Sequence, residues 1–257
     1  MGSVSFLNEI IKVSTLSVLP APHEKAAFVA GMFARIANGY DRMNRIMTFG
    51  LDEWWRRITV DALAPTPNAI MLDIGSGTGP FLPLLRAHAP QGFAIGADFA
   101  LPMMQSGIHR TDARSAFICA DALVLPFGDN SFDTITAGFV IRNVTDIPAT
   151  FRELYRVCKP GGRIAILEVA RPRFAVVRWA HRFYFEQIMP IMAGLLGADP
   201  IAYRYLPESS RQFPDPPILA DMLRQSGWEH VSYRHLPPNA VALHIAVRPH
   251  VLDIADE

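Results

Sequence analysis

Residues 69–79, Ala-Ile-Met-Leu-Asp-Ile-Gly-Ser-Gly-Thr-Gly, join a short apolar run to a loop with three glycines. The run Ala69–Ile74 is too short for a helix, whereas Phe81–His88 after the glycines has the apolar spacing of one. Glycines at the end of a strand let the backbone approach a ligand closely, and the following helix N-terminus favours negative charge. The stretch therefore predicts a strand, a ligand-binding loop and a helix. The alternative is a loop that only reverses the chain.

Four further apolar runs of strand length follow, at Phe93–Asp98, Ala116–Ala120, Phe132–Phe139 and Arg163–Val169. Helical segments lie between them, at Pro102–Ile108 and Ile147–Val157. Strands that alternate with helices are typical of an α/β fold, in which helices cover both faces of a parallel sheet. Pro160-Gly161-Gly162 predicts a sharp turn into the fifth strand.

The segments outside this alternation predict one domain, 23–249, with two additions. Residues 23–64 form a helical cap and follow a loose extension at 1–22. Residues 170–215 form a helical insertion, whose last part is polar and contains prolines. The chain then closes with a helix, two strands and a tail: Ile218–Ser226, Trp228–His235, Val241–Val247 and 250–257.

The composition excludes several classes of protein. Half of the 257 residues are hydrophobic, which excludes disorder, and 24 basic residues balance 24 acidic ones. A net charge of zero argues against nucleic acid as the main partner. The longest uncharged apolar stretch, around Ile188–Ala198, is too short to span a bilayer, and the N-terminus lacks the pattern of a signal peptide.

Cysteine and histidine usage points to a cytoplasmic protein without a metal. Cys119 and Cys158 lie in apolar stretches and form no disulfide framework, so we expect two buried free thiols in a reducing compartment. The eight histidines show no ligand spacing. His244, inside the last apolar strand, is expected to be a core histidine whose hydrogen bonds are satisfied.

The glycine loop discriminates between two classes of cofactor. A dinucleotide fingerprint would place its third glycine at Pro80, but the glycine stands at Gly79. Asp73, in front of the loop, would repel a pyrophosphate and suits a cofactor that carries an amino group and a sulfonium charge. Both features favour S-adenosylmethionine and argue against a nicotinamide oxidoreductase.

Two more acids stand at the ends of the next strands. Asp98 can accept hydrogen bonds from ribose hydroxyls or can begin the following helix, and the two roles can coexist. Asp121, followed by Ala122, can accept from an adenine amino group or can be an ordinary turn residue. Because ligands of open α/β sheets bind at the carboxyl ends of the strands, three such acids favour a nucleoside site.

From about Val29 to about Val247 the chain resembles the ubiquinone/menaquinone-biosynthesis C-methyltransferases. The glycine loop and the lysine-proline-glycine-glycine turn occur in many methyltransferases and are weak support. The resemblance also rests on Tyr40-Asp41, Leu125-Pro126-Phe127 and Leu167-Glu168. The specific motifs are Arg142-Asn143-Val144 and the stretch Tyr203–Ser209 followed by Phe213-Pro214.

The resemblance implies a seven-stranded Rossmann-like fold that uses S-adenosylmethionine to methylate a ring carbon of a polyprenylated quinol. We favour demethylmenaquinol as this substrate. A benzoquinol, another small acceptor and a non-catalytic scaffold remain as alternatives. The expected cofactor site comprises Asp73, Gly75, Gly77, Gly79 and the family contacts Thr78, Asp98, Asp121 and Ala122. Gly138 stands where many members have serine, so no contact is expected there.

Methylation of a ring carbon requires removal of a hydroxyl proton, since phenolate charge makes the adjacent carbon nucleophilic. A fixed cation lowers the cost of that phenolate. Arg142, past the end of the fourth strand, is the candidate cation, and Asn143 is the candidate to orient a hydroxyl or water. Tyr40 and Asp41 are second contributors. The alternative for Arg142 is a loop arginine held in a salt bridge.

The apolar stretch Phe174–Leu196 allows two interpretations. It can be an ordinary core helix, or it can line a tunnel for the polyprenyl tail and contact a membrane surface peripherally. Four arginines would supply a basic face for anionic lipid: Arg171, Arg173, Arg178 and Arg182. The oligomeric state is left open, with a homodimer among the options.

Overall fold

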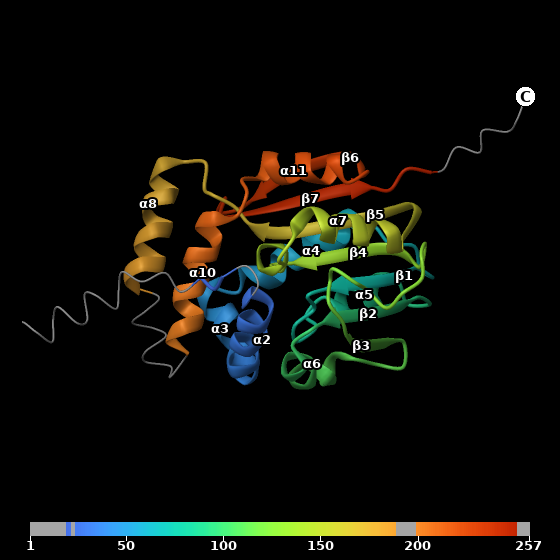
Figure 1. Cartoon of the computed structure of the whole chain (residues 1–257), viewed down its shortest axis with the longest axis horizontal. Helices are drawn as coiled ribbons and strands as arrows, with labels where there is room; N and C mark the ends of the chain where they lie inside the picture. The colour runs from blue at the N-terminus through green and yellow to red at the C-terminus, as the bar shows by residue number, and fades with distance from the viewer. Residues whose placement is uncertain (1–18, 22–23, 189–198, 251–257) are drawn as a thin grey trace, which may run out of the picture.

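The computed structural model of the protein describes residues 19–21, 24–188 and 199–250. Seven strands form one sheet in the order β3-β2-β1-β4-β5-β7-β6 (Figure 1). The first five are parallel, and β7 runs antiparallel to both β5 and β6. The strands are β1 (Ile70–Ile74), β2 (Phe93–Asp98), β3 (Ser115–Cys119), β4 (Phe132–Gly138), β5 (Cys158–Val169), β6 (Glu229–Leu236) and β7 (Val241–Val247).

Helices cover both faces of this sheet, which confirms the predicted Rossmann-like architecture. The α-helices are α2 (Lys25–Ile36), α3 (Tyr40–Met47), α4 (Leu51–Leu63), α5 (Leu82–His88), α6 (Leu101–Gly107), α7 (Ile147–Val157), α8 (Ala175–Phe183), α10 (Pro200–Gln212) and α11 (Pro216–Gln225). Shorter helical turns are η2 (Ala37–Gly39), η3 (Ile108–Arg110), η4 (Ile141–Asn143) and η5 (Tyr184–Ile188).

The two faces of the sheet carry separate hydrophobic cores. Along β5, Ile164 and Ile166 belong to the core beneath α7 and α11, whereas Ala165 and Leu167 belong to the core beneath α4 and α5. This division follows from the alternation of side chains along a strand. Because both faces are covered, side chains on both sides of the parallel strands are mostly apolar, which is why the sequence shows these strands as apolar runs.

The helical cap and the insertion meet at the carboxyl ends of the parallel strands. Helices α2, α3, α8 and α10 lie together at one end of the molecule, toward which the arrows of β4 and β5 point (left in Figure 1). Val29 and Met32 of α2 pack against Ala202 and Tyr205 of α10. These contacts place the cap over the carboxyl ends of the strands, where the glycine loop follows β1.

The insertion and the fifth strand differ from expectation. The polar, proline-containing last part of the predicted helical insertion, for which no particular helix was expected, contains helix α10, which Asp199 caps by accepting a hydrogen bond from the Ile201 N–H at 2.8 Å. Pro160-Gly161-Gly162 is not a turn before β5. It lies inside the strand, since Cys158 already pairs with Phe132 and a register shift follows. The predicted extension and tail lie largely outside the described residues.

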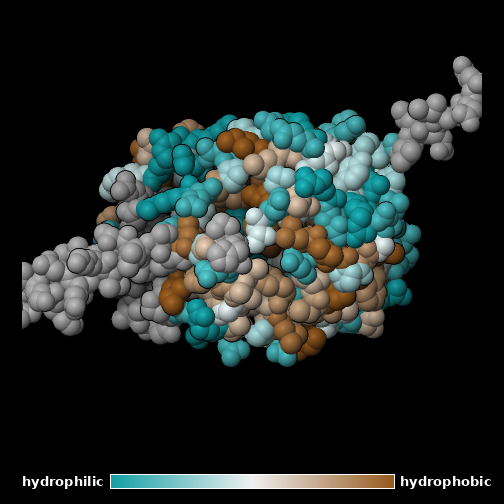
Figure 2. Space-filling model, in the orientation of Figure 1, coloured by the Kyte–Doolittle hydropathy of each residue, from teal (hydrophilic) through white to brown (hydrophobic). Residues whose placement is uncertain are grey.

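The exposure of two further features also departs from expectation. Cys158 is buried, but Cys119 is exposed at the edge strand β3, in an apolar groove alongside α6. Figure 2 shows hydrophobic residues on this part of the surface, where Leu101 and Ile108 are more than half exposed. The core-helix interpretation of Phe174–Leu196 is wrong for α8, because Trp179 is 69% exposed. Residues 189–198 of that stretch lie outside the described part of the chain.

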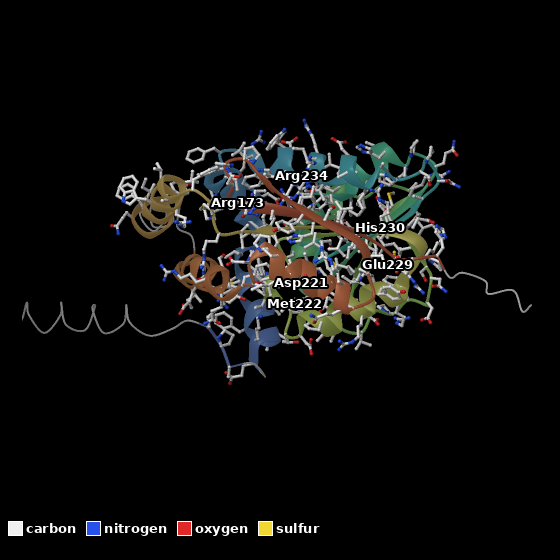
Figure 3. The ribbon with its side chains drawn as sticks, turned by 90° about the horizontal axis from the view of Figure 1, so that it is seen from above. Arg173, Asp221, Met222, Glu229, His230 and Arg234 are labelled. Carbon is white, nitrogen blue, oxygen red and sulfur yellow. The ribbon has the colours of Figure 1, made fainter. Side chains whose placement is uncertain are left out.

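Strand β6 forms the edge of the sheet opposite β3, and α11 packs beside it. Figure 3 shows Asp221 and Met222 on α11 beside the strand, and Glu229 and His230 at its start. His244, on the neighbouring β7, is a core histidine as we expected, but its hydrogen bonds are not all satisfied, because its buried Nδ1 has no partner among the described residues. Its side chain is buried, and its Nε2 lies 3.0 Å from the Pro216 carbonyl oxygen.

Candidate active site

The glycine loop between β1 and α5 has the backbone of a ligand-binding turn. Gly75, Gly77 and Gly79 have φ angles of +60°, +55° and +74°. A Cβ at Gly75 would stand 2.1 Å from Val140 Cγ2, and one at Gly79 would stand 2.5 Å from Phe117 Cζ. Larger side chains are therefore excluded by both backbone conformation and space. The strand–loop–helix prediction is confirmed.

Asp98, the last residue of β2, holds this loop in place. Its Oδ2 accepts a hydrogen bond from the Gly77 N–H at 2.7 Å, and its Oδ1 accepts one from the Ala100 N–H at 2.8 Å. The second bond lies just before α6, so Asp98 also organises the start of that helix. Burial raises the pKa of Asp98, opposed by these backbone hydrogen bonds.

Asp73 lies beneath the loop rather than at its surface. The side chain is 1% exposed, and its Oδ1 accepts a hydrogen bond from the Thr136 hydroxyl at 2.7 Å. Its Oδ2 is buried and has no hydrogen-bond partner among the described residues. Burial raises the pKa of Asp73 to about 7, although Thr136 and Arg56 oppose the shift. A buried carboxylate oxygen without a partner is costly, which indicates that a bound group satisfies it.

A cleft beside the loop brings together residues from four strand ends and from the cap. Its lining includes five predicted site residues: Gly75, Asp98, Asp121, Ala122 and Asn143. Ala26 of α2 lines the same cleft. Asp121 is exposed, and its Oδ1 accepts a hydrogen bond from the Leu123 N–H at 2.9 Å, so the turn role that we considered is present.

Thr78 does not line this cleft but joins the loop to the cap. Its hydroxyl donates to Asp41 Oδ1 at 2.7 Å. Arg110 donates to Asp41 Oδ2 at 2.8 Å and to the Thr78 carbonyl oxygen at 2.9 Å. No sequence signal marked Arg110. Asp41, which we had considered as a contributor to catalysis, contacts the cofactor loop in the structure.

Arg142 and Asn143 lie next to each other in η4, each with a buried partner. The Arg142 guanidinium pairs with Glu168 at the end of β5, and both side chains are at least nine-tenths buried. Asn143 Oδ1 accepts a hydrogen bond from the Tyr205 hydroxyl at 3.1 Å. The salt bridge that we considered for Arg142 is therefore present. Glu168 ends an apolar strand as Asp98 does, so the same rule could have found it.

Tyr40 lies apart from Arg142 and Asn143. Its ring packs edge-on against Phe33 at 5.7 Å, in a cluster with Ala37 and the start of α6. A catalytic role for Tyr40 stays a prediction. Lys25 is closer to the pair, because its Nζ donates to the carbonyl oxygens of Arg142 and Val144 at 3.0 and 2.7 Å.

Comparison with known proteins identifies the family. The model of the ubiE/COQ5 methyltransferase family matches residues 21–248. The chain belongs to the ubiE/COQ5 methyltransferase family. Members of this family use S-adenosylmethionine, so the protein is an S-adenosylmethionine-dependent methyltransferase. The resemblance noted from the sequence motifs is confirmed.

Curated relatives match nearly the whole family domain. A demethylmenaquinone methyltransferase of Roseiflexus castenholzii is 52% identical over 233 residues, which cover 90% of this chain and 98% of the relative. One of Thermus thermophilus is 41% identical and covers 85% of this chain and all of the relative. A ubiquinone/menaquinone biosynthesis C-methyltransferase of Cereibacter sphaeroides is 39% identical and covers 86% and 90%.

Solved structures at low identity share the fold of this family member. An S-adenosylmethionine-dependent methyltransferase of Aquifex aeolicus is 15% identical with a TM-score of 0.59, covering 81% of this chain and 97% of that one. The phosphoethanolamine N-methyltransferase 2 of Haemonchus contortus, solved with S-adenosylmethionine, is 16% identical with a TM-score of 0.56. It is matched over 76% of this chain and 52% of its own.

The residues of this ubiE/COQ5 family member fit the cofactor. Gly75 leaves the backbone bare at the floor of the cleft, and Asp98 and Asp121 stand at its sides. The partnerless oxygen of Asp73 lies beneath the loop, and a cationic cofactor nearby would favour the charged form of this carboxyl. Asp98, Asp121 and Ala122 line the cleft together and could hold the nucleoside, and their contact with the cofactor stays a prediction.

Proposed function

We propose that the protein methylates a ring carbon of a polyprenylated quinol, and that demethylmenaquinol is its substrate. The observation that carries this proposal is the 52% identity, over almost the full length, to a relative named demethylmenaquinone methyltransferase. Relatives whose name also covers ubiquinone stand at 37% to 39% identity. This difference favours a naphthoquinol over a benzoquinol head group.

The chemistry requires a nucleophilic carbon beside the cofactor. Bound S-adenosylmethionine supplies a methyl group on a positively charged sulfur. A phenol with a pKa of about 10 keeps its proton at neutral pH, so the protein must stabilise the phenolate that activates the ring. Arg142 is the charged group that we assign to this task, since η4 follows β4 at the cleft.

The ion pair with Glu168 refines this assignment. A guanidinium that is neutralised by a carboxylate stabilises an anion less than a free one does, but the pair fixes where the positive end lies. We assign the direct contact with the quinol hydroxyl to Asn143, because this residue lines the cleft, where Tyr205 holds its Oδ1 and the Phe139 carbonyl oxygen accepts a long hydrogen bond of 3.4 Å from its Nδ2. Arginine is a poor base, so Arg142 acts by its charge rather than by removing the proton.

A competition between acceptors tests the head group. The protein receives labelled S-adenosylmethionine with equal amounts of a reduced demethylnaphthoquinone and of the matching demethylated benzoquinone, both with short prenyl tails. We expect label predominantly in the naphthoquinol. Equal labelling, or preference for the benzoquinol, would contradict the assignment of demethylmenaquinol and would support the ubiquinone-type alternative.

We also propose that α8 contacts an anionic membrane surface, from which a polyprenylated substrate must be taken. Phe174, Val176, Trp179 and Phe183 are 61%, 77%, 69% and 49% exposed. The rings of Trp179 and Phe183 stack at 5.8 Å, as residues four apart on one helix face do. Aromatic residues with neighbouring arginines are typical of helices that lie in the membrane interface.

Charge supports the same choice of surface. No acidic residue occurs between Arg171 and Phe185 in the sequence, whereas that stretch contains four arginines. Among them, Arg173 and Arg178 are exposed. Figure 3 shows Arg173 near one end of β6, whereas His230 lies at the other end of that strand. No described helix has both the length and the apolar character that crossing a bilayer requires. The proposed contact is therefore with the surface of the bilayer.

Vesicle sedimentation tests this contact independently of catalysis. We expect binding to phosphatidylglycerol vesicles, weak binding to phosphatidylcholine vesicles, and loss of binding in Val176→Ser. Val124→Ser is the matched control, because both valines are 77% exposed and Val124 lies outside α8. Equal loss in the two variants, or equal binding to the two lipids, would overturn the proposal.

A further inference from the structure

The helical cap touches both sides of the active site through two charged side chains. On one side, Lys25 of α2 donates to the carbonyl oxygens of Arg142 and Val144 at 3.0 and 2.7 Å. These carbonyls flank Asn143, which lines the cleft. The ammonium group, which is half buried, thus fixes the backbone on both sides of the residue assigned to the quinol.

On the other side, Asp41 of α3 fixes the cofactor loop at Thr78. The Thr78 hydroxyl donates to Asp41 Oδ1 at 2.7 Å, while Arg110 donates both to Asp41 Oδ2 and to the Thr78 carbonyl oxygen. Helix α6 approaches from a third direction, since a Cβ on Gly107 would stand 2.0 Å from that carbonyl oxygen. Thr78 is therefore held by side chain and backbone together.

We propose that Asp41 and Lys25 are positioning residues with separate tasks. Asp41 sets the cofactor loop through Thr78, and Lys25 sets the segment that carries Arg142 and Asn143. The second task rests on the proposed function, because it concerns the quinol side of the site. Neither residue is among those that line the cleft, so each acts through the groups that it holds.

The separation of tasks predicts a separation of kinetic effects. Asp41→Leu keeps the size of the side chain but removes both acceptors, so cofactor affinity falls about three- to tenfold, the range expected for a lost hydrogen bond or two. Its kcat at saturating cofactor stays within about twofold of wild type. Lys25→Met shows the reverse, with kcat lower by about three- to tenfold and cofactor affinity nearly unchanged.

The experiment measures the dissociation constant of S-adenosylhomocysteine by calorimetry and kcat with a reduced demethylnaphthoquinone. Asp41→Asn and Lys25→Arg, which keep part of the hydrogen bonding, are expected to recover part of each loss. Glu53→Gln is the control. It removes an exposed pair with Arg57 within α4 and is expected to leave both constants unchanged.

A double-mutant cycle tests whether Asp41 acts through Thr78. On a Thr78→Val background, Asp41→Leu is expected to add little further loss of S-adenosylhomocysteine affinity. Full additivity would overturn the role of Asp41, and an equal change of both constants in either variant would overturn the division of tasks. If wild type binds S-adenosylhomocysteine but does not methylate the quinol, the proposed function fails while the Asp41 measurements still decide their own question.

Discussion

Arg142 donates two hydrogen bonds to Glu168, one from its guanidinium Nη1 to Oε1 and one from its backbone N–H to Oε2 at 3.3 Å. The two residues belong to the segments that follow β4 and end β5, so the pair ties these neighbouring strand ends together beside the cleft. Both side chains are buried, so removal of one charge would leave the other buried without its partner. The proposed catalytic role of Arg142 is therefore linked to its contribution to stability.

Replacement of Arg142 by alanine is expected to damage both properties. It leaves Glu168 as a buried charge without its partner, which costs about 3–5 kcal/mol of unfolding free energy. Among the molecules that remain folded, kcat falls strongly, whereas S-adenosylhomocysteine affinity changes little. At one pH, urea unfolding measures the unfolding free energy, calorimetry measures the S-adenosylhomocysteine affinity, and methyl transfer to a reduced demethylnaphthoquinone measures kcat.

The double variant Arg142→Met/Glu168→Leu distinguishes the structural from the catalytic role. Apolar residues of similar volume often replace a buried ion pair without loss of stability, so we expect near wild-type unfolding free energy with activity still strongly reduced. Wild-type activity in this double variant would show that the charge of Arg142 is not used in the reaction.

Asp73 predicts an unusual pH dependence of stability. Burial raises its pKa to about 7, so the folded protein keeps this proton at pH values where the unfolded chain has lost it. Stability is therefore lost as pH rises from about 4 to about 7, by up to about 4 kcal/mol from this group. Asp73→Asn is expected to be more stable than wild type at pH 8 in the absence of cofactor, and equal to it near pH 4. A stability difference that does not vary with pH would contradict this account.

His244 contributes the opposite slope. Burial lowers its pKa to about 4, so the unfolded chain takes up a proton first as pH falls below about 6.5. Acidification from there to about 4 costs the wild type up to about 3 kcal/mol from this group. His244→Gln should show a shallower loss of unfolding free energy over that interval. An unchanged slope would show that the imidazole titrates normally.

Gly75→Ala tests the floor of the cleft. Its new Cβ would meet Val140 at 2.1 Å, and the residue would keep a left-handed backbone, so we expect about 2–4 kcal/mol of destabilisation and weaker cofactor binding. The added Val140→Ala change should relieve the clash but not the backbone cost. Gly39→Ala is the control, because nothing lies within 4 Å of its Cβ position. Equal losses of stability and cofactor affinity at the two glycines would contradict the role given to Gly75 at the floor of the cleft.

The elements that sequence patterns located best are those that depend on local signals. The strands Phe93–Asp98 and Val241–Val247 and the helix Ile147–Val157 have the predicted bounds. The three glycines marked the loop, because glycine adopts its left-handed backbone most easily and leaves room for Val140 and Phe117. Acids at strand ends located most of the cleft, since parallel strands bring their carboxyl ends to one edge of the sheet.

Features that depend on tertiary contacts were not visible in the sequence. Helix α10 was not located individually within the predicted helical insertion, because its stretch is polar and contains Pro207, and proline usually ends a helix. Burial of Tyr205 against the cap provides stabilisation that no local pattern reveals. The partners of Arg142 and Thr78 are 26 and 37 residues away in the chain, and only the fold brings them together.

The most direct test of the account is product analysis with a single acceptor. The protein is incubated with methyl-labelled S-adenosylmethionine and reduced demethylmenaquinone, and the quinone is recovered and analysed by mass spectrometry and NMR. We expect one labelled methyl group on the ring carbon next to the hydroxyl. Label on a hydroxyl oxygen, or bound cofactor with no transfer to the quinol, would contradict the central claim.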